Sequence, residues 1–171
     1  MDDEDDILIK RIHKKELPNL VSVYQSAYQR LQKYAYRSER KIKSYLEWLY
    51  EGDPEGFFVA EKENMLIGFV SIHSDWKDWR WGRTGELHEL AVKIEFQGKG
   101  IGKKLFLTAL NYAKEKGCKI ISLWVGEENW LARSWYQKLG FKERGSWGEW
   151  VRMSLSFPIV EKMNKNTRKN I

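Results

Sequence analysis

A run of glycines among lysines is the part of the sequence best suited to hold a ligand. Gly98, Gly100 and Gly102 lie within five positions of one another in QGKGIG, directly before a segment with helical periodicity. Bare backbone N–H groups at a helix N-terminus, helped by the helix dipole, bind phosphate groups well, and the neighbouring lysines add positive charge. The run therefore predicts an anion site. The alternative is a tight strand-to-helix turn that needs only the conformational freedom of glycine.

Two common nucleotide-binding patterns do not match this run. In the dinucleotide pattern G-x-G-x-x-G the third glycine would come one position later, and an acid would follow at a set distance. In the P-loop pattern a glycine would stand at Gln97 and a serine or threonine at Lys104. What remains is Q-x-x-G-x-G between a predicted strand and a predicted helix.

The composition indicates one soluble globular domain without metal. The chain has 171 residues, of which 42% are hydrophobic and 32% charged, and it has no apolar run of membrane-spanning length. The single cysteine, Cys118, excludes an internal disulfide framework and a cysteine-based zinc cluster. His13, His73 and His88 are too scattered to suggest a metal site.

Charge divides the chain into a basic body and an acidic start. The net charge is +6, and without the five acids of residues 2–6 it is about +11. A basic body favours anionic partners such as nucleic acid or a phosphate-bearing cofactor, or else it is a solvated surface. Because a secretory signal would open basic, we expect a cytoplasmic protein. We expect an acidic disordered tail over 1–6, one domain over 7–160 and a basic disordered tail over 161–171.

Hydrophobic periodicity predicts the order βααβββαβαββ. The predicted elements are a strand at 7–12, helices at 17–34 and 39–50, strands at 57–62, 65–74 and 86–92, a helix at 100–116, a strand at 119–125, a helix at 130–140 and a hairpin at 141–157. Residues 75–85 are expected to form a polar, tryptophan-rich loop. The strand–helix–strand unit over 86–125 predicts a parallel pair, and short turns elsewhere predict antiparallel pairing. We therefore expect an α/β (α+β) fold with a mixed, mostly antiparallel sheet and helices on both faces.

Two segments resemble the GCN5-related N-acetyltransferase superfamily. LAVKIEFQGKGIGKKL, residues 90–105, is similar to the pyrophosphate-binding motif of that family, and NWLARSWYQKLGF, residues 129–141, is similar to its second motif. The spacing of the motifs and the element order match as well. The resemblance is clear over 57–145 and looser over 7–56, and it implies a sheet splayed between its fourth and fifth strands.

The resemblance implies an acetyl-CoA-dependent N-acyltransferase that moves an acetyl group to an amine by direct attack. The implied acceptor is a peptide N-terminus, a lysine or a small amine, among which the sequence does not choose. Acetyl-CoA is the implied co-substrate, without a metal. The alternative is a catalytically silent regulatory domain that binds CoA, against which the intact Tyr136, Asn129 and glycines argue.

The resemblance also assigns the cofactor contacts. The backbone of Leu90–Val92 would pair with the pantetheine arm like an added strand, and Gly98–Lys103 would hold the pyrophosphate. Asn129 would contact pantetheine or phosphate, or alternatively cap the helix that begins at Trp130. The expected cofactor-binding residues are Leu90, Ala91, Val92, Gln97, Gly98, Lys99, Gly100, Ile101, Gly102, Lys103, Asn129 and Tyr136.

Direct transfer needs a base for the amine and an acid for the departing thiolate. Tyr136 stands at the position of the general acid in the family, with a packed core tyrosine as the alternative. Glu86, His88 and Glu89 are the candidate bases. Strand alternation puts Glu86 and His88 on one face and Glu89 on the other, unless a bulge, frequent in the family, re-aims Glu89. We expect Glu86 and His88 to act together as a proton relay, the alternative being ordinary polar residues on a half-exposed strand.

Nine tryptophans are many for a chain of this length. Trp76, Trp79 and Trp81 crowd one loop, and Trp147 and Trp150 flank a hairpin turn. Loops at these places help to form the acceptor side in the family, where aromatic walls suit a cationic or apolar amine. The alternative is packing of loops onto the sheet. Nucleic acid is disfavoured because the aromatic residues do not alternate along a strand face. The family often forms dimers, but the sequence identifies no interface.

Overall fold

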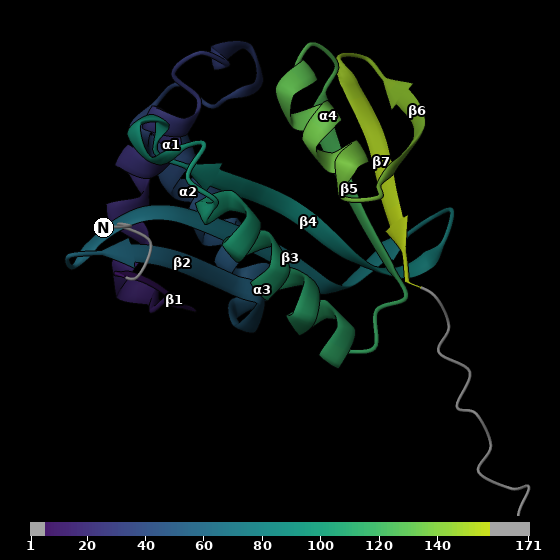
Figure 1. The fold of residues 1–171 in the computed structure, drawn as a ribbon, viewed down its shortest axis with the longest axis horizontal. Coiled ribbons are helices and arrows are strands. Elements are labelled where there is room, and N and C mark those ends of the chain that lie inside the picture. The colour runs from purple at the N-terminus through teal and green to yellow at the C-terminus, as the bar shows by residue number, and fades with distance from the viewer. Residues whose placement is uncertain (1–5, 158–171) are drawn as a thin grey trace, which may run out of the picture.

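The computed structural model describes residues 6–157 and contains the predicted order of helices and strands (Figure 1). The strands are β1 (Ile7–Arg11), β2 (Phe57–Lys62), β3 (Met65–Asp78), β4 (Gly82–Val92), β5 (Ile120–Gly126), β6 (Lys142–Trp147) and β7 (Trp150–Ser156). The α-helices are α1 (Val21–Ala27), α2 (Glu39–Gly52), α3 (Ile101–Glu115) and α4 (Trp130–Lys138). Short 3-10 turns are η1 (Lys14–Leu20), η2 (Gln32–Tyr34), η3 (Pro54–Gly56) and η4 (Ile94–Phe96). Apart from Asp6, the two predicted tails lie outside the described residues.

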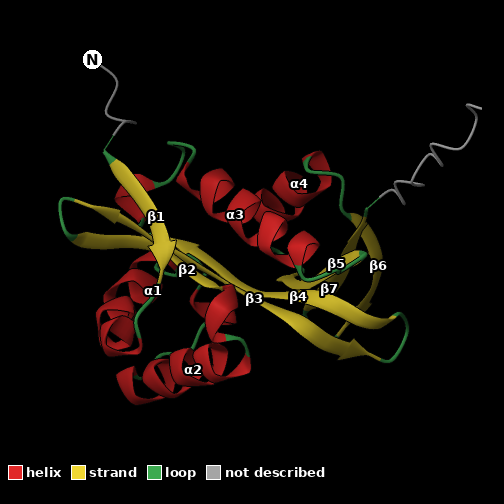
Figure 2. Cartoon of the chain, turned by 90° about the horizontal axis from the view of Figure 1, so that it is seen from below, coloured by secondary structure: helices red, strands yellow, loops and turns green. Residues whose placement is uncertain are grey.

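One seven-stranded sheet forms the centre of the fold. Its order is β1-β2-β3-β4-β5-β7-β6, and every neighbouring pair is antiparallel except β4 and β5. Helices α1 and α2 lie on one face and α3 and α4 on the other (Figure 2). The predicted mixed sheet with helices on both faces is confirmed.

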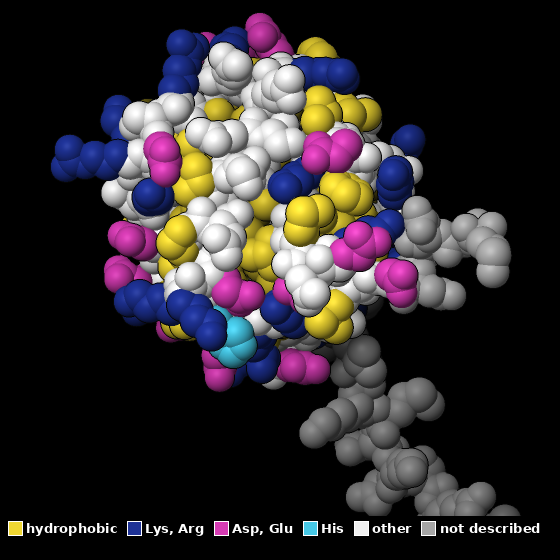
Figure 3. Space-filling model, turned by 90° about the vertical axis from the view of Figure 1, so that its left-hand side faces the viewer, with side chains coloured by type: hydrophobic (Ala, Val, Ile, Leu, Met, Phe, Trp, Pro, Cys, Tyr) yellow, Lys and Arg dark blue, Asp and Glu magenta, His cyan; other side chains and the backbone are white. Residues whose placement is uncertain are grey.

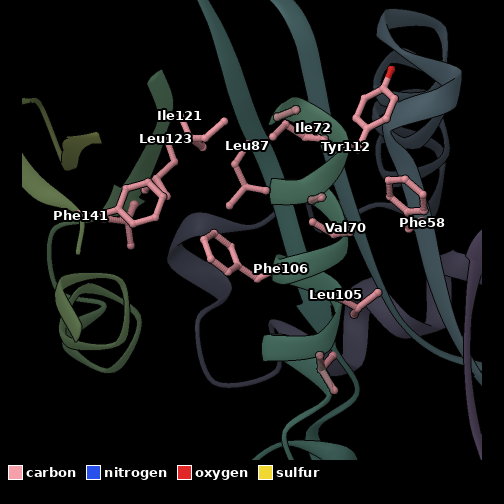
Figure 4. Packing of buried hydrophobic residues seen from close by; sticks show 14 of the residues in the cluster. Phe58, Val70, Ile72, Leu87, Leu105, Phe106, Tyr112, Ile121, Leu123 and Phe141 are labelled. Atoms are coloured by element: carbon pink, nitrogen blue, oxygen red, sulfur yellow. The ribbon is translucent and has the colours of Figure 1, made fainter. Parts of the chain in front are cut away.

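The apolar stripes of the helices make two cores. Ile101, Leu105, Ala109 and Ala113 of α3 are buried against the sheet. Figure 4 shows Phe106 of the same helix and Phe141 reaching toward β5 on the far side of this core. On the other face, the stripe of α2 packs with η1 and α1 in a second core. Each buried Leu or Ile side chain stabilises the fold by about 1.5–3 kcal/mol, so these stripes hold the helices in place.

Two predicted elements are wrong in extent. The helix expected over 17–34 is divided into η1, α1 and η2, because the chain leaves the helix at Tyr28 and crosses to the other half of the sheet. The loop expected over 75–85 is a hairpin instead, in which β3 runs to Asp78 and β4 starts at Gly82. Its alternating polar and aromatic residues suit an exposed two-stranded ribbon.

The sheet is splayed at the junction of β4 and β5. The two strands share only the pairs Gly85 with Ile121 and Glu86 with Ser122, and then diverge. A Cβ at Gly85 would lie 2.7 Å from Cδ1 of Ile121, so a larger residue here would make the Ile121 side chain move. The opening of the V between β4 and β5 is visible in Figure 1.

The surplus of basic side chains is dispersed on the face seen in Figure 3. Lysine and arginine alternate there with acids and apolar groups. The face in Figure 3 therefore shows mixed charges rather than one basic patch. Among the lysines of the structure, Lys10 of β1 contacts the carboxylates of both Glu16 and Glu61.

Candidate active site

A cleft of about 610 Å³ occupies the opening between β4 and β5. Its walls come from β4, from the segment that contains α1 and η2, from β5 and α4, and from the β6–β7 turn. Aromatic side chains dominate the lining: Tyr24, Tyr28, Tyr34, Tyr36, Tyr45, Trp124, Tyr136, Trp147 and Trp150. All three candidate bases and Tyr136 lie on these walls.

A β-bulge in β4 sets the direction of the candidate bases. Ser71 of β3 pairs with Glu89, whereas the next residue, Ile72, pairs with Leu87, so His88 is the extra residue. The bulge turns Glu89 toward Tyr45 of α2, the same helix whose Trp48 contacts His88. Simple alternation, which put these two residues on opposite faces, is therefore wrong here, and the expected bulge is confirmed.

Glu89 is a buried carboxylate held by two phenols. The Tyr28 hydroxyl donates to Oε1 of Glu89 at 2.7 Å, and the Tyr45 hydroxyl donates to Oε2 at 3.1 Å. Burial raises the pKa of Glu89 from 4.5 to about 7, against the opposing effect of these hydrogen bonds and of the Leu90 N–H. A carboxylate with this pKa exchanges protons near neutral pH.

Glu86 forms a buried ion pair. Its Oε1 accepts from Nη1 of Arg152 at 2.6 Å, and its Oε2 accepts from the Ser122 hydroxyl at 2.6 Å. The same guanidinium donates to Asp78 at 2.7 Å. Glu86 therefore links β4, β5 and β7 as one partner of a buried ion pair.

His88 lies in an aromatic cage. Its ring is 4.8 Å from those of Trp48 and Trp76, and 6.1 Å from that of His73, while its Nε2 is buried without a hydrogen-bond partner in the described part of the chain. Burial lowers the pKa of His88 to about 4, with the charges of His73 and Arg152 adding to the effect. The imidazole is therefore neutral at physiological pH. The contacts of Glu86 and His88 do not favour the expected relay between them.

Tyr136 packs against the core and also faces the cleft. Its ring packs on Trp135 and Phe141 at centroid distances of 5.2 and 5.4 Å, and it also lines the cleft. Burial, and then the charge of Glu89, raise its pKa above the ordinary value of 10. The phenol thus stays protonated and is electrostatically coupled to Glu89 across the cleft.

The residues expected to hold acetyl-CoA fit that molecule. Beyond Glu86, β4 has no strand partner on its β5 side, so Leu90–Val92 offers a free backbone edge. Gly98 and Gly100 adopt positive φ values of 75° and 80°, and Gly100 is the N-cap of α3. The first N–H groups of a helix have no partner within it, so this turn presents donors and the positive end of a dipole. These features suit an extended pantetheine arm followed by a diphosphate.

Two residues named from the sequence have structural contacts as well. The side chain of Asn129 accepts from the Ala132 N–H at 3.3 Å, so the predicted cap of α4 is confirmed. Asn129 also lines the cleft. Gln97 donates from Nε2 to the carbonyl of Val92 at 2.9 Å, which fixes the glycine turn against the end of β4.

A contact across the cleft was not expected from the sequence. Lys33 lies 3.2 Å from a carboxylate oxygen of Glu128 and 3.3 Å from one of Glu149. The Tyr34 hydroxyl accepts from the Glu128 N–H at 2.9 Å, and its ring lies 5.3 Å from that of Trp150. We call this group of contacting residues the clasp: Lys33, Tyr34, Glu128, Glu149 and Trp150. The continuous helical pattern over 17–34 gave no signal of this contact.

The splayed sheet, its free edge and the glycine turn define a transferase fold of the acyl-CoA-binding class. Comparisons with known proteins agree. A model of the Acetyltransferase (GNAT) family matches residues 17–141. The chain is 40% identical over 141 residues to an uncharacterized N-acetyltransferase of Archaeoglobus fulgidus, which covers 82% of this chain and 96% of the relative. The chain belongs to the GNAT family.

Solved structures show the same fold. The crystal structure of PH1933 from Pyrococcus horikoshii OT3 is similar with a TM-score of 0.81 and 37% identity, over 88% of this chain and 98% of that one. PaiA N-acetyltransferase from Thermoplasma acidophilum, in complex with coenzyme A, has a TM-score of 0.70 and 27% identity, over 88% and 99% of the two chains.

These findings make the chain an acetyl-CoA-dependent acyltransferase. The described residues contain no group of three or more His, Cys, Asp or Glu side chains that could hold a metal ion. Within the same residues no helix is long and apolar enough to cross a membrane.

Proposed function

We propose that this acetyltransferase acts on an amine, with Glu89 as the general base and Tyr136 as the general acid. The observation that carries the proposal is the carboxylate of Glu89, buried on the cleft wall with a pKa of about 7. A base is most effective when its pKa lies near the working pH, and an ordinary carboxylate would be too weak to deprotonate an ammonium group.

The surroundings of Glu89 suit this role. Two phenol donors fix the orientation of the carboxylate, and burial excludes bulk water. Glu86 differs because its carboxylate forms a buried ion pair with Arg152, whereas the side chains that donate to Glu89 are neutral phenols. Neutral His88 is less suited to take the proton, because its low pKa makes it a weak base and its Nε2 is buried without a hydrogen-bond partner among residues 6–157.

Tyr136 suits the opposite proton transfer. Its raised pKa keeps the hydroxyl protonated until a thiolate departs. In the complete step the amine nitrogen forms a bond to the acetyl carbon and the carbon–sulfur bond breaks. Glu89 takes one proton of the ammonium group, and the thiolate takes the proton of Tyr136. The second proton that the nitrogen loses after the attack restores the Tyr136 hydroxyl.

Release of free CoA thiol from acetyl-CoA tests the proposal. The assay uses a panel of amines: peptides with free N-termini, lysine peptides, polyamines and arylalkylamines. We expect Glu89→Gln to lower kcat by about 10²–10³-fold and Tyr136→Phe by about ten- to a hundredfold, since general acids and bases contribute on this scale. The affinity for acetyl-CoA, measured by calorimetry, should stay within about twofold.

Glu143→Gln is the matched control, because it neutralises a carboxylate that pairs with Arg133 outside the cleft. Unchanged turnover in Glu89→Gln would refute its role as the base. Binding of acetyl-CoA with no transfer to any amine would support the alternative, a silent CoA-binding domain.

A further inference from the structure

A second hollow of about 490 Å³ lies beside the active-site cleft. It is formed between the β3–β4 hairpin and β5, β7 and β6, and its aromatic residues are Trp79, Trp81, Trp124 and Trp147. We call it the tryptophan groove. Trp124 and Trp147 also line the cleft, so the two hollows share a wall.

The tryptophans of the groove are exposed to an unusual degree. Trp79 is 87% exposed, Trp147 79% and Trp124 45%. Helices α1 and α2 cover the other half of this sheet face and leave β5, β7 and β6 without a helix there (Figure 2). Clustered, exposed tryptophans rimmed by polar groups mark a surface that binds a partner.

The charges of the groove favour an acidic partner. Arg152 is neutralised by Glu86 and Asp78, which leaves neither carboxylate free. Arg80 stacks between Trp79 and Trp81, at 5.0 and 5.3 Å from their ring centroids.

Arg80 also donates to the carbonyl of Arg144, whose own Nε donates to the hydroxyl of Ser154. In the described chain neither Arg80 nor Arg144 pairs with an acid. Guanidinium groups bind carboxylates with two parallel hydrogen bonds, so this pair can receive an acidic side chain.

The clasp adds a constraint on the route of the acceptor. Tyr34 packs on Trp150 and on Gly126, where a Cβ would lie 2.5 Å from the tyrosine ring, and so joins the two walls of the cleft. The free edge of β4 and the glycine turn are assigned to acetyl-CoA. If the acceptor extends beyond its reacting amine, the rest of the molecule therefore passes Trp124 and Trp147 and lies in the tryptophan groove.

We propose that the acceptor is a polypeptide whose amine reaches Glu89, while the residues beside that amine lie in the tryptophan groove. The groove selects a segment with an aromatic or aliphatic side chain next to Asp or Glu. A polyamine is a poor acceptor, because the groove offers it no free carboxylate. This inference rests on the function proposed above and specifies its substrate class.

Steady-state kinetics with matched peptides test the inference. One peptide carries aromatic and acidic residues after its free N-terminus, and its counterpart carries lysines in place of the acids. A second pair places the amine on an internal lysine. Spermidine and an arylalkylamine complete the set. We expect kcat/KM for an acidic peptide to exceed that of its basic counterpart at least tenfold, and that of spermidine by more.

Variants of the groove should change this preference alone. Arg80→Glu with Arg144→Glu should lower the acidic-over-basic ratio at least tenfold, and Lys15→Glu with Lys119→Glu, the same charge change on exposed lysines elsewhere, should not. Trp147→Ala, at an exposed site that tolerates truncation, should raise KM for peptides about tenfold and leave the affinity for acetyl-CoA unchanged.

The possible failures are distinguishable. Efficient transfer to spermidine or the arylalkylamine but not to peptides would overturn the inference and leave the proposed function standing. Transfer to peptides regardless of their charge, unaffected by Trp147→Ala, would also overturn it. Absence of transfer to every amine would refute the proposed function itself.

Discussion

At the scale of single residues, the proposed base is one carboxylate whose environment opposes its charge. Glu89 has two phenol donors that favour ionisation and a buried position that disfavours it, and the second effect is the larger. Because the balance sets the pKa, the two tyrosines tune this carboxylate as well as orient it.

Removal of one phenol should therefore shift the pH dependence. Tyr45→Phe deletes the hydrogen bond to Oε2 of Glu89 and should move the acidic limb of the kcat/KM profile upward by about half to one pH unit, from its wild-type midpoint near pH 7. The sign follows because the lost bond favours the ionised form. The measurement is kcat/KM against pH with one acceptor for all variants.

Tyr50→Phe is the control on the same helix, since the hydroxyl of Tyr50 has no hydrogen-bond partner among residues 6–157. A limb that moves downward in Tyr45→Phe, or equally in both variants, would contradict the assignment to Glu89.

Glu89 was one of three candidate bases in the sequence, but the sequence alone could not distinguish it from Glu86 and His88. The choice depends on the register of β4 against β3, where one extra residue turns Glu89 toward α2. It depends equally on Arg152 of β7, which forms an ion pair with Glu86 although the two residues are 66 positions apart in the sequence. Motif residues such as Gly100 and Tyr136 could be proposed directly from the sequence because the spacing within each motif is local.

At the scale of elements, the turn before α3 needs a glycine at position 100 for two separate reasons. Gly100 has a φ of 80°, which costs any L-residue about 1–2 kcal/mol, and its backbone is also expected to contact the diphosphate. The first demand concerns folding and the second concerns binding.

Two equal substitutions at opposite ends of α3 separate these demands. Gly100→Val should weaken acetyl-CoA binding at least tenfold, because a branched side chain would block the approach to the N–H groups. Gly117→Val carries the same backbone strain, with a φ of 81°, past the other end of the helix and should retain full affinity. Calorimetry measures binding and circular dichroism verifies folding. Equal affinity in both variants would reduce the turn to a structural role.

The clasp is an element-scale contact with a single required glycine. Gly126→Ala places a methyl group 2.5 Å from the Tyr34 ring and should expel Tyr34 from its position on Trp150. We expect trypsin to cleave at Arg30, Lys33 or Arg37 at least several times faster than in the wild type, since released loops are cut readily. Gly102→Ala, whose new methyl meets only an ordinary contact at 3.9 Å, is the control. An unchanged cleavage rate would show that the loop is held by other contacts.

The periodicity of residues 17–34 gave no indication of this contact. Apolar residues continue at helical spacing through Leu31, but the chain departs at Tyr28 to place Lys33 and Tyr34 on the far wall. The partner of Tyr34 is 94 positions away, so a local pattern cannot contain it. Helices α2, α3 and α4 were predicted well because each is stabilised by its own apolar stripe.

At the scale of the whole molecule, the two parts of the sheet share few paired strand residues. Only two residue pairs connect β4 to β5, and Arg152 adds a buried link from β7 to Glu86 of β4 and Asp78 of β3. Burial opposes the ionisation of Asp78, but the N–H of Arg80 and the guanidinium of Arg152 outweigh it and lower the pKa of Asp78 below 3.8.

Loss of this link should destabilise the fold strongly. Arg152→Met leaves two buried carboxylates without their cation and should lower the free energy of unfolding by about 3–5 kcal/mol at pH 7. Arg83→Met, which breaks the exposed pair with Asp75 and an exposed hydrogen bond to the carbonyl of Lys116, should lower it by only about 1 kcal/mol. Urea unfolding measures both.

The acid dependence adds a second test of the same link. A carboxyl group whose pKa is lower in the folded than in the unfolded chain stabilises the fold at any pH above its pKa in the unfolded chain. That contribution is lost as the pH falls through its pKa in the folded chain. The deficit of Arg152→Met should therefore shrink as the pH falls from 7 toward 3, because wild-type Asp78 then loses its own stabilisation. Hydrogen exchange should localise the deficit to β5, β6 and β7, which depend on this link across the open V. Uniform exchange over both parts of the sheet, with a deficit independent of pH, would mean that the apolar cores alone join them.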